Sequence, residues 1–164
     1  MAFLKFKDIA VTGIAASVPS NKVINSDYPF SNEQEKKLFI QNTGIEERRI
    51  INRAMTAADL CQKAAEELMD SMKIDPSEIK ILIFVTQTPD YITPATAVKL
   101  QADLDLPNDC LAFDMNLGCS GYVYGLSNAA SLLSNMTEGK ALLLVGDTSS
   151  ACISSEDKSA APLF

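Results

Sequence analysis

The stretch Phe113-Asp114-Met115-Asn116-Leu117-Gly118-Cys119-Ser120-Gly121-Tyr122 joins two apolar segments of different kinds. The short run 110–113 before it predicts a strand, and the long segment 120–133 after it predicts a buried helix. Cys119 would then stand at a helix N-terminus, where unpaired backbone N–H groups carry a partial positive charge that favours a thiolate. This pattern indicates a nucleophile. The alternative is a small buried hydrophobic residue, which is how free cysteines often behave.

Segments that read as strands alternate with segments that read as helices along the chain. Apolar and β-branched runs predict the strands, and apolar residues at helical spacing behind capping residues Ser31 and Thr56 predict the helices. The predicted strands are 9–16, 81–85, 110–113, 141–145 and 159–164, with a short extended piece at 23–24, and the predicted helices are 31–41, 57–72, 95–104 and 120–133. The alternation predicts an α/β fold with a mixed, mostly parallel sheet flanked by helices.

Three loops follow predicted strands and are candidates for one site. Because functional sites of parallel sheets lie beyond the carboxyl ends of the strands, we expect loops 86–91, 118–119 and 146–150 to converge. Cys61 lies on the apolar face of its predicted helix and is assigned to the core. The charged stretch 45–50 reads as a solvated loop with local ion pairs.

Composition narrows the class of protein. With 47% hydrophobic and 21% charged residues, the chain reads as one globular domain over residues 1–164. A net charge of −7 argues against nucleic acid and anionic membranes as main partners. Neither a secretory signal nor a membrane-spanning run is evident, so we expect a cytoplasmic protein. The four cysteines form no CxxC pair and histidine is absent, so we expect free thiols and no metal site.

The chain ends on an apolar pair, Leu163-Phe164, with no turn, cap or polar tail after it. Natural termini are more often polar and frayed. We therefore expect the sequence to be a piece of a longer protein.

Four motifs agree in order and spacing with those of one enzyme family. They are TGIEER at 43–48, QTPDYITPATA at 87–97, NLGCSGYVYGL at 116–126 and LLVGD at 143–147. Together they resemble 3-oxoacyl-acyl-carrier-protein synthase III, a family of thiolase-like condensing enzymes, over nearly the whole chain. The resemblance implies that residues 1–164 form the N-terminal half of a thiolase-like fold, with the helix after the nucleophilic cysteine buried and the C-terminal half missing.

The resemblance implies a mechanism centred on Cys119. The thiol would take an acyl group from a thioester, usually an acyl-coenzyme A, and the full-length enzyme would condense it with malonyl-acyl carrier protein, which loses carbon dioxide. No cofactor is implied, since acyl-coenzyme A or acyl-acyl carrier protein is the substrate. The family's histidine and asparagine lie in the second half. The absence of histidine here implies that this chain alone does not condense.

Departures from the family concern the substrate. Leu38 and Lys158 stand where the family often has the tryptophan and arginine that sandwich the adenine of coenzyme A, and Asn42 replaces a nearby arginine. These side chains cannot form the same flat stack, so either another residue compensates or the donor is an acyl-acyl carrier protein. Thr93 stands where the family often places a phenylalanine that lines the partner subunit's acyl pocket. Its smaller side chain predicts an acyl group other than acetyl.

The partners implied are acyl carrier protein, an acyl thioester and a second copy of the chain as a homodimer, without nucleic acid or membrane. Two other functions stay open. A relative of the family could pass the acyl group to an amine or hydroxyl instead of malonyl. A non-catalytic domain could only dimerise or dock a carrier protein, and the absence of histidine favours this alternative for the chain as it stands.

Overall fold

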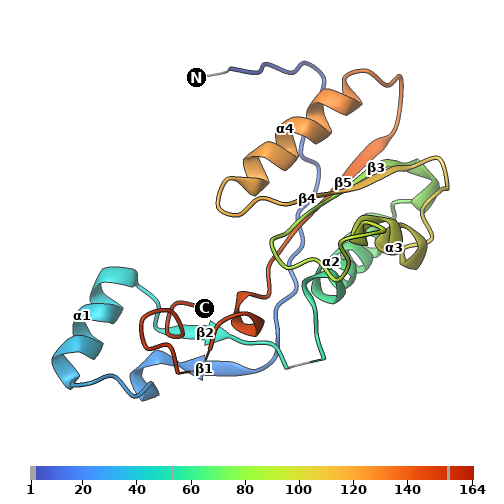
Figure 1. Ribbon diagram of the computed structural model, residues 1–164. Helices are drawn as coiled ribbons and strands as arrows, with labels where there is room; N and C mark the ends of the chain where they lie inside the picture. The colour runs from blue at the N-terminus through green and yellow to red at the C-terminus, as the bar shows by residue number, and fades with distance from the viewer. Residues whose placement is uncertain (1–2, 53, 155) are drawn as a thin grey trace. The chain divides into compact units, whose positions relative to one another are not determined.

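The computed structural model describes residues 3–52, 54–154 and 156–164 (Figure 1). The chain divides into two compact units. The first, which we call the sheet unit, comprises Met1–Ser17 and Thr56–Asp147. The second, which we call the strand-pair unit, comprises Val18–Met55 and Thr148–Phe164.

A three-stranded parallel sheet organises the sheet unit. The central strand β3 (Ile79–Val85) lies between β4 (Leu111–Met115) and β5 (Lys140–Val145). Apart from Lys80, every residue of β3 is at most 2% exposed, as the continuous apolar run predicts for a strand covered on both faces. The predicted strands 81–85, 110–113 and 141–145 are therefore confirmed, with the second displaced by one or two residues.

Helices cover both faces of this sheet. Alternate β3 side chains, Leu82 and Phe84, pack with residues of α2 (Ala57–Met72) and α3 (Thr96–Asp103). The intervening side chains of β3 pack on the other face against α4 (Gly121–Leu133). The predicted α/β class, with a parallel sheet flanked by helices, is confirmed.

The three helices begin close to the predicted positions. In α2 the Thr56 hydroxyl accepts a hydrogen bond from the Asp59 N–H, and the Asp59 carboxylate accepts one from the Thr56 N–H, so the predicted cap is a complete capping box. The helix α4 departs from prediction in its burial. Its residues 122–124 are about half exposed or more, whereas Gly121 and Gly125 are buried, so it has one buried face rather than being buried throughout.

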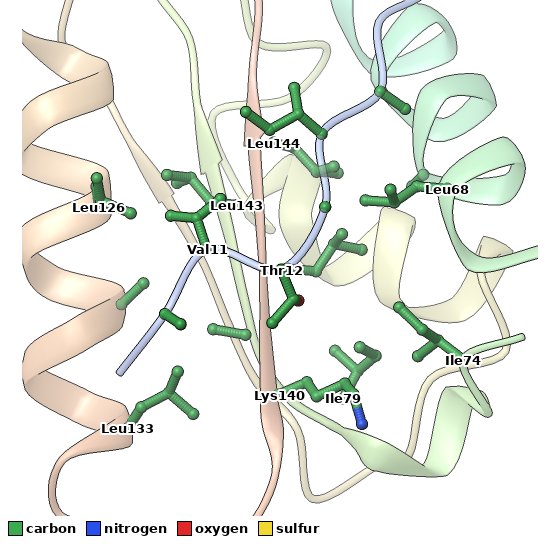
Figure 2. Close-up of a pocket in the computed structure, with 18 of the residues that line it drawn as sticks. Val11, Thr12, Leu68, Ile74, Ile79, Leu126, Leu133, Lys140, Leu143 and Leu144 are labelled. Atoms are coloured by element: carbon green, nitrogen blue, oxygen red, sulfur yellow. The ribbon is translucent and has the colours of Figure 1, made fainter. Parts of the chain in front are cut away.

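The predicted strand at 9–16 is wrong. The segment runs beside β5 (Figure 2), but no ladder hydrogen bond joins the two in the described part of the chain. It packs instead through apolar contacts, with Gly13 against Leu68 and Met72 of α2. Together with α2, α4 and β5 it lines an apolar cavity of about 520 Å³.

The strand-pair unit contains a short antiparallel pair and one longer helix. β1 (Lys22–Ile24) pairs with β2 (Glu47–Arg49), so the prediction of a solvated loop at 45–50 is wrong, while the extended piece at 23–24 is confirmed. The helix α1 (Glu33–Thr43) is capped by Asn32, not by the predicted Ser31. It ends at Gly44, whose φ of 70° lies in the left-handed region. Short 3-10 turns complete the chain at Asn25–Asp27, Pro76–Glu78 and Ser149–Ala151.

A buried polar network occupies the centre of the strand-pair unit. Asn25 is fully buried, and its Nδ2 donates to the carbonyl oxygens of Ile45 and Pro162, both at 2.9 Å. Its Oδ1 accepts from Arg48 Nε at 2.8 Å, and Arg48 Nη1 donates to the carbonyl oxygens of Ala161 and Phe164. Burial lowers the pKa of Arg48. The predicted strand at 159–164 is wrong, because this segment forms turns whose carbonyl groups bind these side chains.

In the residues that the structure describes, every helix is too short or too polar to cross a membrane.

Candidate active site

The loops predicted to form a site begin at the edge of the sheet where β3, β4 and β5 end. The pairing continues one residue beyond β3, where the Thr86 N–H donates to the Met115 carbonyl at 3.1 Å. On the other side the Gly146 N–H donates to the Val85 carbonyl at 3.2 Å. The three loops therefore leave the sheet at the same level.

Asp147 ties two of these loops together. Its Oδ1 accepts the Thr86 hydroxyl at 2.9 Å and the Gln87 backbone N–H at 2.6 Å. The Thr86 hydroxyl oxygen also accepts the Thr88 N–H at 3.0 Å, which tightens the turn after β3. The predicted convergence is confirmed for the loops that follow β3 and β5.

The loop after β4 carries Cys119 and packs against the loop after β3. A Cβ atom at Gly118 would lie 2.6 Å from Gln87 Oε1, so only glycine fits there without moving the Gln87 side chain. The Gly121 N–H donates to the Gly118 carbonyl at 2.7 Å and closes a tight turn. Cys119 lies inside this turn, two residues before the first residue of α4.

Exposure and pKa separate the four thiols. Burial, and to a smaller degree the charge of Asp147, raises the pKa of Cys61 from 9.0 to about 11. Burial, followed by the charge of Asp109, also raises the pKa of Cys110. Both thiols therefore stay protonated at neutral pH, and the predicted core role of Cys61 is confirmed. Cys119 and Cys152 are exposed, one in each unit.

The predicted substrate-binding residues are all exposed. Leu38 and Asn42 lie one turn apart on the same side of α1. Lys158 lies in a turn that the Asp157 carboxylate anchors by accepting the Ser159 N–H at 2.9 Å. These three residues belong to the strand-pair unit, whereas Cys119 and Thr93 belong to the sheet unit. Their roles in binding stay predictions.

Sequence reasoning missed the anchoring roles of several polar side chains. Asp147 and Gln87 fell inside predicted loops, but no contact between them was predicted. A carboxylate two positions beyond the end of a parallel strand was the available signal, because such a side chain can reach the unpaired N–H groups of the neighbouring loop. For Asn25 and Arg48 the local sequence carried no comparable signal.

Comparisons with known proteins agree with the motifs. The family described as 3-Oxoacyl-[acyl-carrier-protein (ACP)] synthase III matches residues 113–164. A beta-ketoacyl-[acyl-carrier-protein] synthase III from Chlorobium phaeobacteroides is 35% identical over 94% of this chain and 47% of its own length. A crystal structure of 3-oxoacyl-(acyl-carrier protein) synthase from Burkholderia xenovorans LB400 matches 92% of this chain and 44% of its own, with 41% identity and a TM-score of 0.85.

In sequence and fold, the chain is similar to 3-oxoacyl-acyl-carrier-protein synthase III enzymes over about half of their length. A second relative, a beta-ketoacyl-[acyl-carrier-protein] synthase III from Levilactobacillus brevis, is 31% identical over 98% of the chain and 49% of the relative. The chain thus spans about half the length of the curated synthase III relatives it matches. The resemblance read from the four motifs is confirmed.

Proposed function

We propose that Cys119 is the acyl-accepting nucleophile of a 3-oxoacyl-acyl-carrier-protein synthase III. The observation that carries the proposal is the exposed thiol in the tight turn Gly118–Gly121, at the N-terminus of α4 and inside the segment matched by the family. The Cys119 thiolate attacks the carbonyl carbon of an acyl thioester. A new carbon–Sγ bond forms, the donor's carbon–sulfur bond breaks, and the donor leaves as a thiolate that takes up a proton.

Condensation follows in the complete enzyme. Malonyl-acyl carrier protein loses carbon dioxide, and the resulting carbanion attacks the acyl group on Cys119 to give a 3-oxoacyl product and the free thiol. The family polarises the malonyl thioester with a histidine and an asparagine, and this chain contains no histidine. The groups for this step therefore come from outside these 164 residues, and the chain alone stops at the acyl-enzyme.

The donor is proposed to be an acyl group carried by acyl carrier protein. Leu38, Asn42 and Lys158 lack the flat aromatic and guanidinium groups that stack on adenine, so ordinary recognition of coenzyme A is weakened. Basic residues on and near α1 offer a contact for an acidic carrier, namely Lys36, Lys37, Arg48 and Arg49. Three of them are already engaged: Lys36 pairs with Glu33, Arg48 serves the buried network, and Arg49 Nη1 donates to the Ser20 carbonyl at 3.1 Å. Lys37, which is exposed, is therefore the better candidate.

Thr93 is proposed to leave room for an acyl group larger than acetyl. Thr93 is exposed in the segment before α3, and it would face the acyl pocket of a second copy in a homodimer. A Thr93→Phe change in the complete enzyme should shift the preference towards short acyl donors. An unchanged donor profile would contradict this assignment.

Acyl transfer to the chain tests the central proposal. The protein is incubated with acetyl-, butyryl- and octanoyl-coenzyme A and with the same groups on acyl carrier protein, and acylated peptides are located by mass spectrometry. We expect the acyl group on Cys119, absent in Cys119→Ala and retained in Cys152→Ala. Acylation of Cys119 and Cys152 to the same extent would contradict the proposal that Cys119 is a specific nucleophile.

The absence of histidine favours a second candidate, a non-catalytic domain that docks a carrier protein. That function predicts binding of acyl carrier protein without acylation of Cys119, and equal binding by Cys119→Ala. Transfer to an amine or hydroxyl is separated from condensation by products, since only condensation releases carbon dioxide from malonyl-acyl carrier protein.

A further inference from the structure

Asp147 is an exposed carboxylate that accepts two hydrogen bonds from a neighbouring loop. It follows β5, and its Oδ1 accepts both the Thr86 hydroxyl and the Gln87 N–H. Hydrogen bonds to an ionised acceptor are shorter and about twice as strong as neutral ones. The conformation of the residues after β3 therefore depends on a side chain supplied from β5.

Gln87 passes this anchoring on to the turn that contains Cys119. Its side chain lies against Gly118, since a Cβ there would meet Gln87 Oε1 at 2.6 Å and Cδ at 2.9 Å. The Gly118 carbonyl in turn accepts the Gly121 N–H that opens α4. A continuous set of contacts thus runs from the Asp147 carboxylate through Gln87 to the backbone on either side of Cys119.

We infer that Asp147 is a positioning residue for Cys119, acting through Gln87. The inference rests on the proposed role of Cys119 as the nucleophile. Without the Asp147 acceptor, Gln87 no longer has a fixed backbone position, and its side chain no longer supports Gly118. The Cys119 side chain then loses its fixed place in the turn before α4, which lowers its reactivity.

Rates of iodoacetamide alkylation, resolved by cysteine in the 164-residue chain, test the inference. Asp147→Ala removes both acceptor and charge, whereas Asp147→Asn removes the charge and keeps an oxygen acceptor. Comparing these two variants therefore isolates positioning from the electrostatic effect of the carboxylate on the thiolate. We expect Cys119 in Asp147→Ala to react about two- to fivefold more slowly than in Asp147→Asn. Equal rates in the two variants would overturn the inference.

Two controls, the variant Asp75→Ala and the reactivity of Cys61, exclude a general loss of structure. Asp75 also anchors a turn, by accepting the Ser77 N–H at 2.8 Å, but it precedes the opposite end of β3, so Asp75→Ala should leave the Cys119 rate unchanged. Cys61, against which a Cβ at Gly146 would pack at 3.0 Å, should stay unreactive in every variant unless the unit opens.

Gln87→Ala keeps the inference testable if Asp147→Ala opens the unit. Gln87→Ala should slow Cys119 to a similar extent, and the double variant should be little slower than either single one because both act on one set of contacts. An unchanged rate in Gln87→Ala, or fully additive losses, would overturn the inference. A wild-type Cys119 that reacts no faster than Cys152 would instead overturn the proposed function itself, and the inference with it.

Discussion

Each of the two units is stabilised internally by a different kind of contact. In the sheet unit the central strand β3 is buried on both faces by apolar side chains from three helices. In the strand-pair unit a fully buried amide, Asn25, joins the half-buried guanidinium of Arg48. An apolar core loses stability in proportion to the volume removed, whereas a polar network fails when one member leaves its partners unpaired.

This difference also separates the two parts of the proposed function. Cys119 follows a strand of the apolar sheet, so the proposed nucleophile is placed by the unit with the apolar core. Leu38, Asn42 and Lys158, the residues predicted to contact the donor, belong to the unit held by the polar network. Substitutions should therefore affect nucleophile and donor recognition separately.

The largest effect is expected in the apolar unit. Phe84→Ala removes a side chain with no exposed surface from the core of the sheet unit, and such truncations cost about 3–5 kcal/mol. Hydrogen exchange resolved by peptide should show faster exchange in 79–85 and 140–145, with 22–24 and 47–49 unchanged. Val98→Ala, at a half-exposed position of α3, serves as the control and should cost well under 1 kcal/mol. Equal acceleration of both units would contradict their separate stabilisation.

A single substitution of Asn25 should destabilise the strand-pair unit. Asn25→Ala leaves Arg48 Nε and the carbonyls of Ile45 and Pro162 without this hydrogen-bond partner, at a cost of about 2–3 kcal/mol. Exchange should rise in 22–24, 47–49 and 160–164, and stay unchanged in the sheet unit. Asn42→Ala, an exposed asparagine in the same unit, is the matched control and should have little effect. A small loss for Asn25→Ala would mean that apolar contacts also hold this unit.

Alkaline pH should weaken the sheet unit through Cys61. Its pKa is raised by burial from 9.0 to about 11. Between these values the folded state keeps a proton that the unfolded state releases, so stability present below pH 9 is lost as pH rises to 11, by about 2 kcal/mol. Denaturation at pH 8 and pH 10.5 measures this. The loss should shrink in Cys61→Ala and persist in Cys152→Ala, whose thiol is exposed. A Cys61→Ala variant with the full alkaline loss would contradict the assignment.

The smallest effect concerns the end of α1. Gly44 has a φ of 70°, and no atom lies within 4 Å of the position that a Cβ would take. Gly44→Ala should therefore cost only the backbone strain of a left-handed alanine, about 1 kcal/mol, and Gly44→Asn less than that. Thermal denaturation of the two variants compares these losses. A neutral alanine would show that the helix end can move to a relaxed conformation.

The parts predicted from sequence are those whose signal is local. The continuous apolar run of β3 and the capping box at Thr56 each specify their element without knowledge of a distant partner. The pairing of β1 with β2 was missed because both strands are three residues long, β2 is wholly charged, and more than twenty residues separate the two. The segment 9–16 has a strand-like composition, but a strand also needs a hydrogen-bonded neighbour, and its contacts to α2 are apolar.

In the candidate site, too, the sequence predicted local features and not the contacts between distant residues. Cys119 was predicted from its turn and the apolar segment that follows. Its exposure matches a reactive thiol, but α4 is covered on only one face, which the largely apolar sequence did not indicate. The contacts of Asp147 with Thr86 and Gln87 link residues 60 or more positions apart. Such a pairing follows from the parallel order β4-β3-β5, which is set by the whole sheet and not by any one motif.

The most direct test of the central claim is competitive alkylation of the four thiols at neutral pH. A substoichiometric pulse of iodoacetamide, followed by peptide mass spectrometry, measures each relative rate. We expect Cys119 to react fastest, Cys152 more slowly, and the buried Cys61 and Cys110 hardly at all. A Cys119 that reacts no faster than Cys152 would contradict a nucleophile built into the turn before α4.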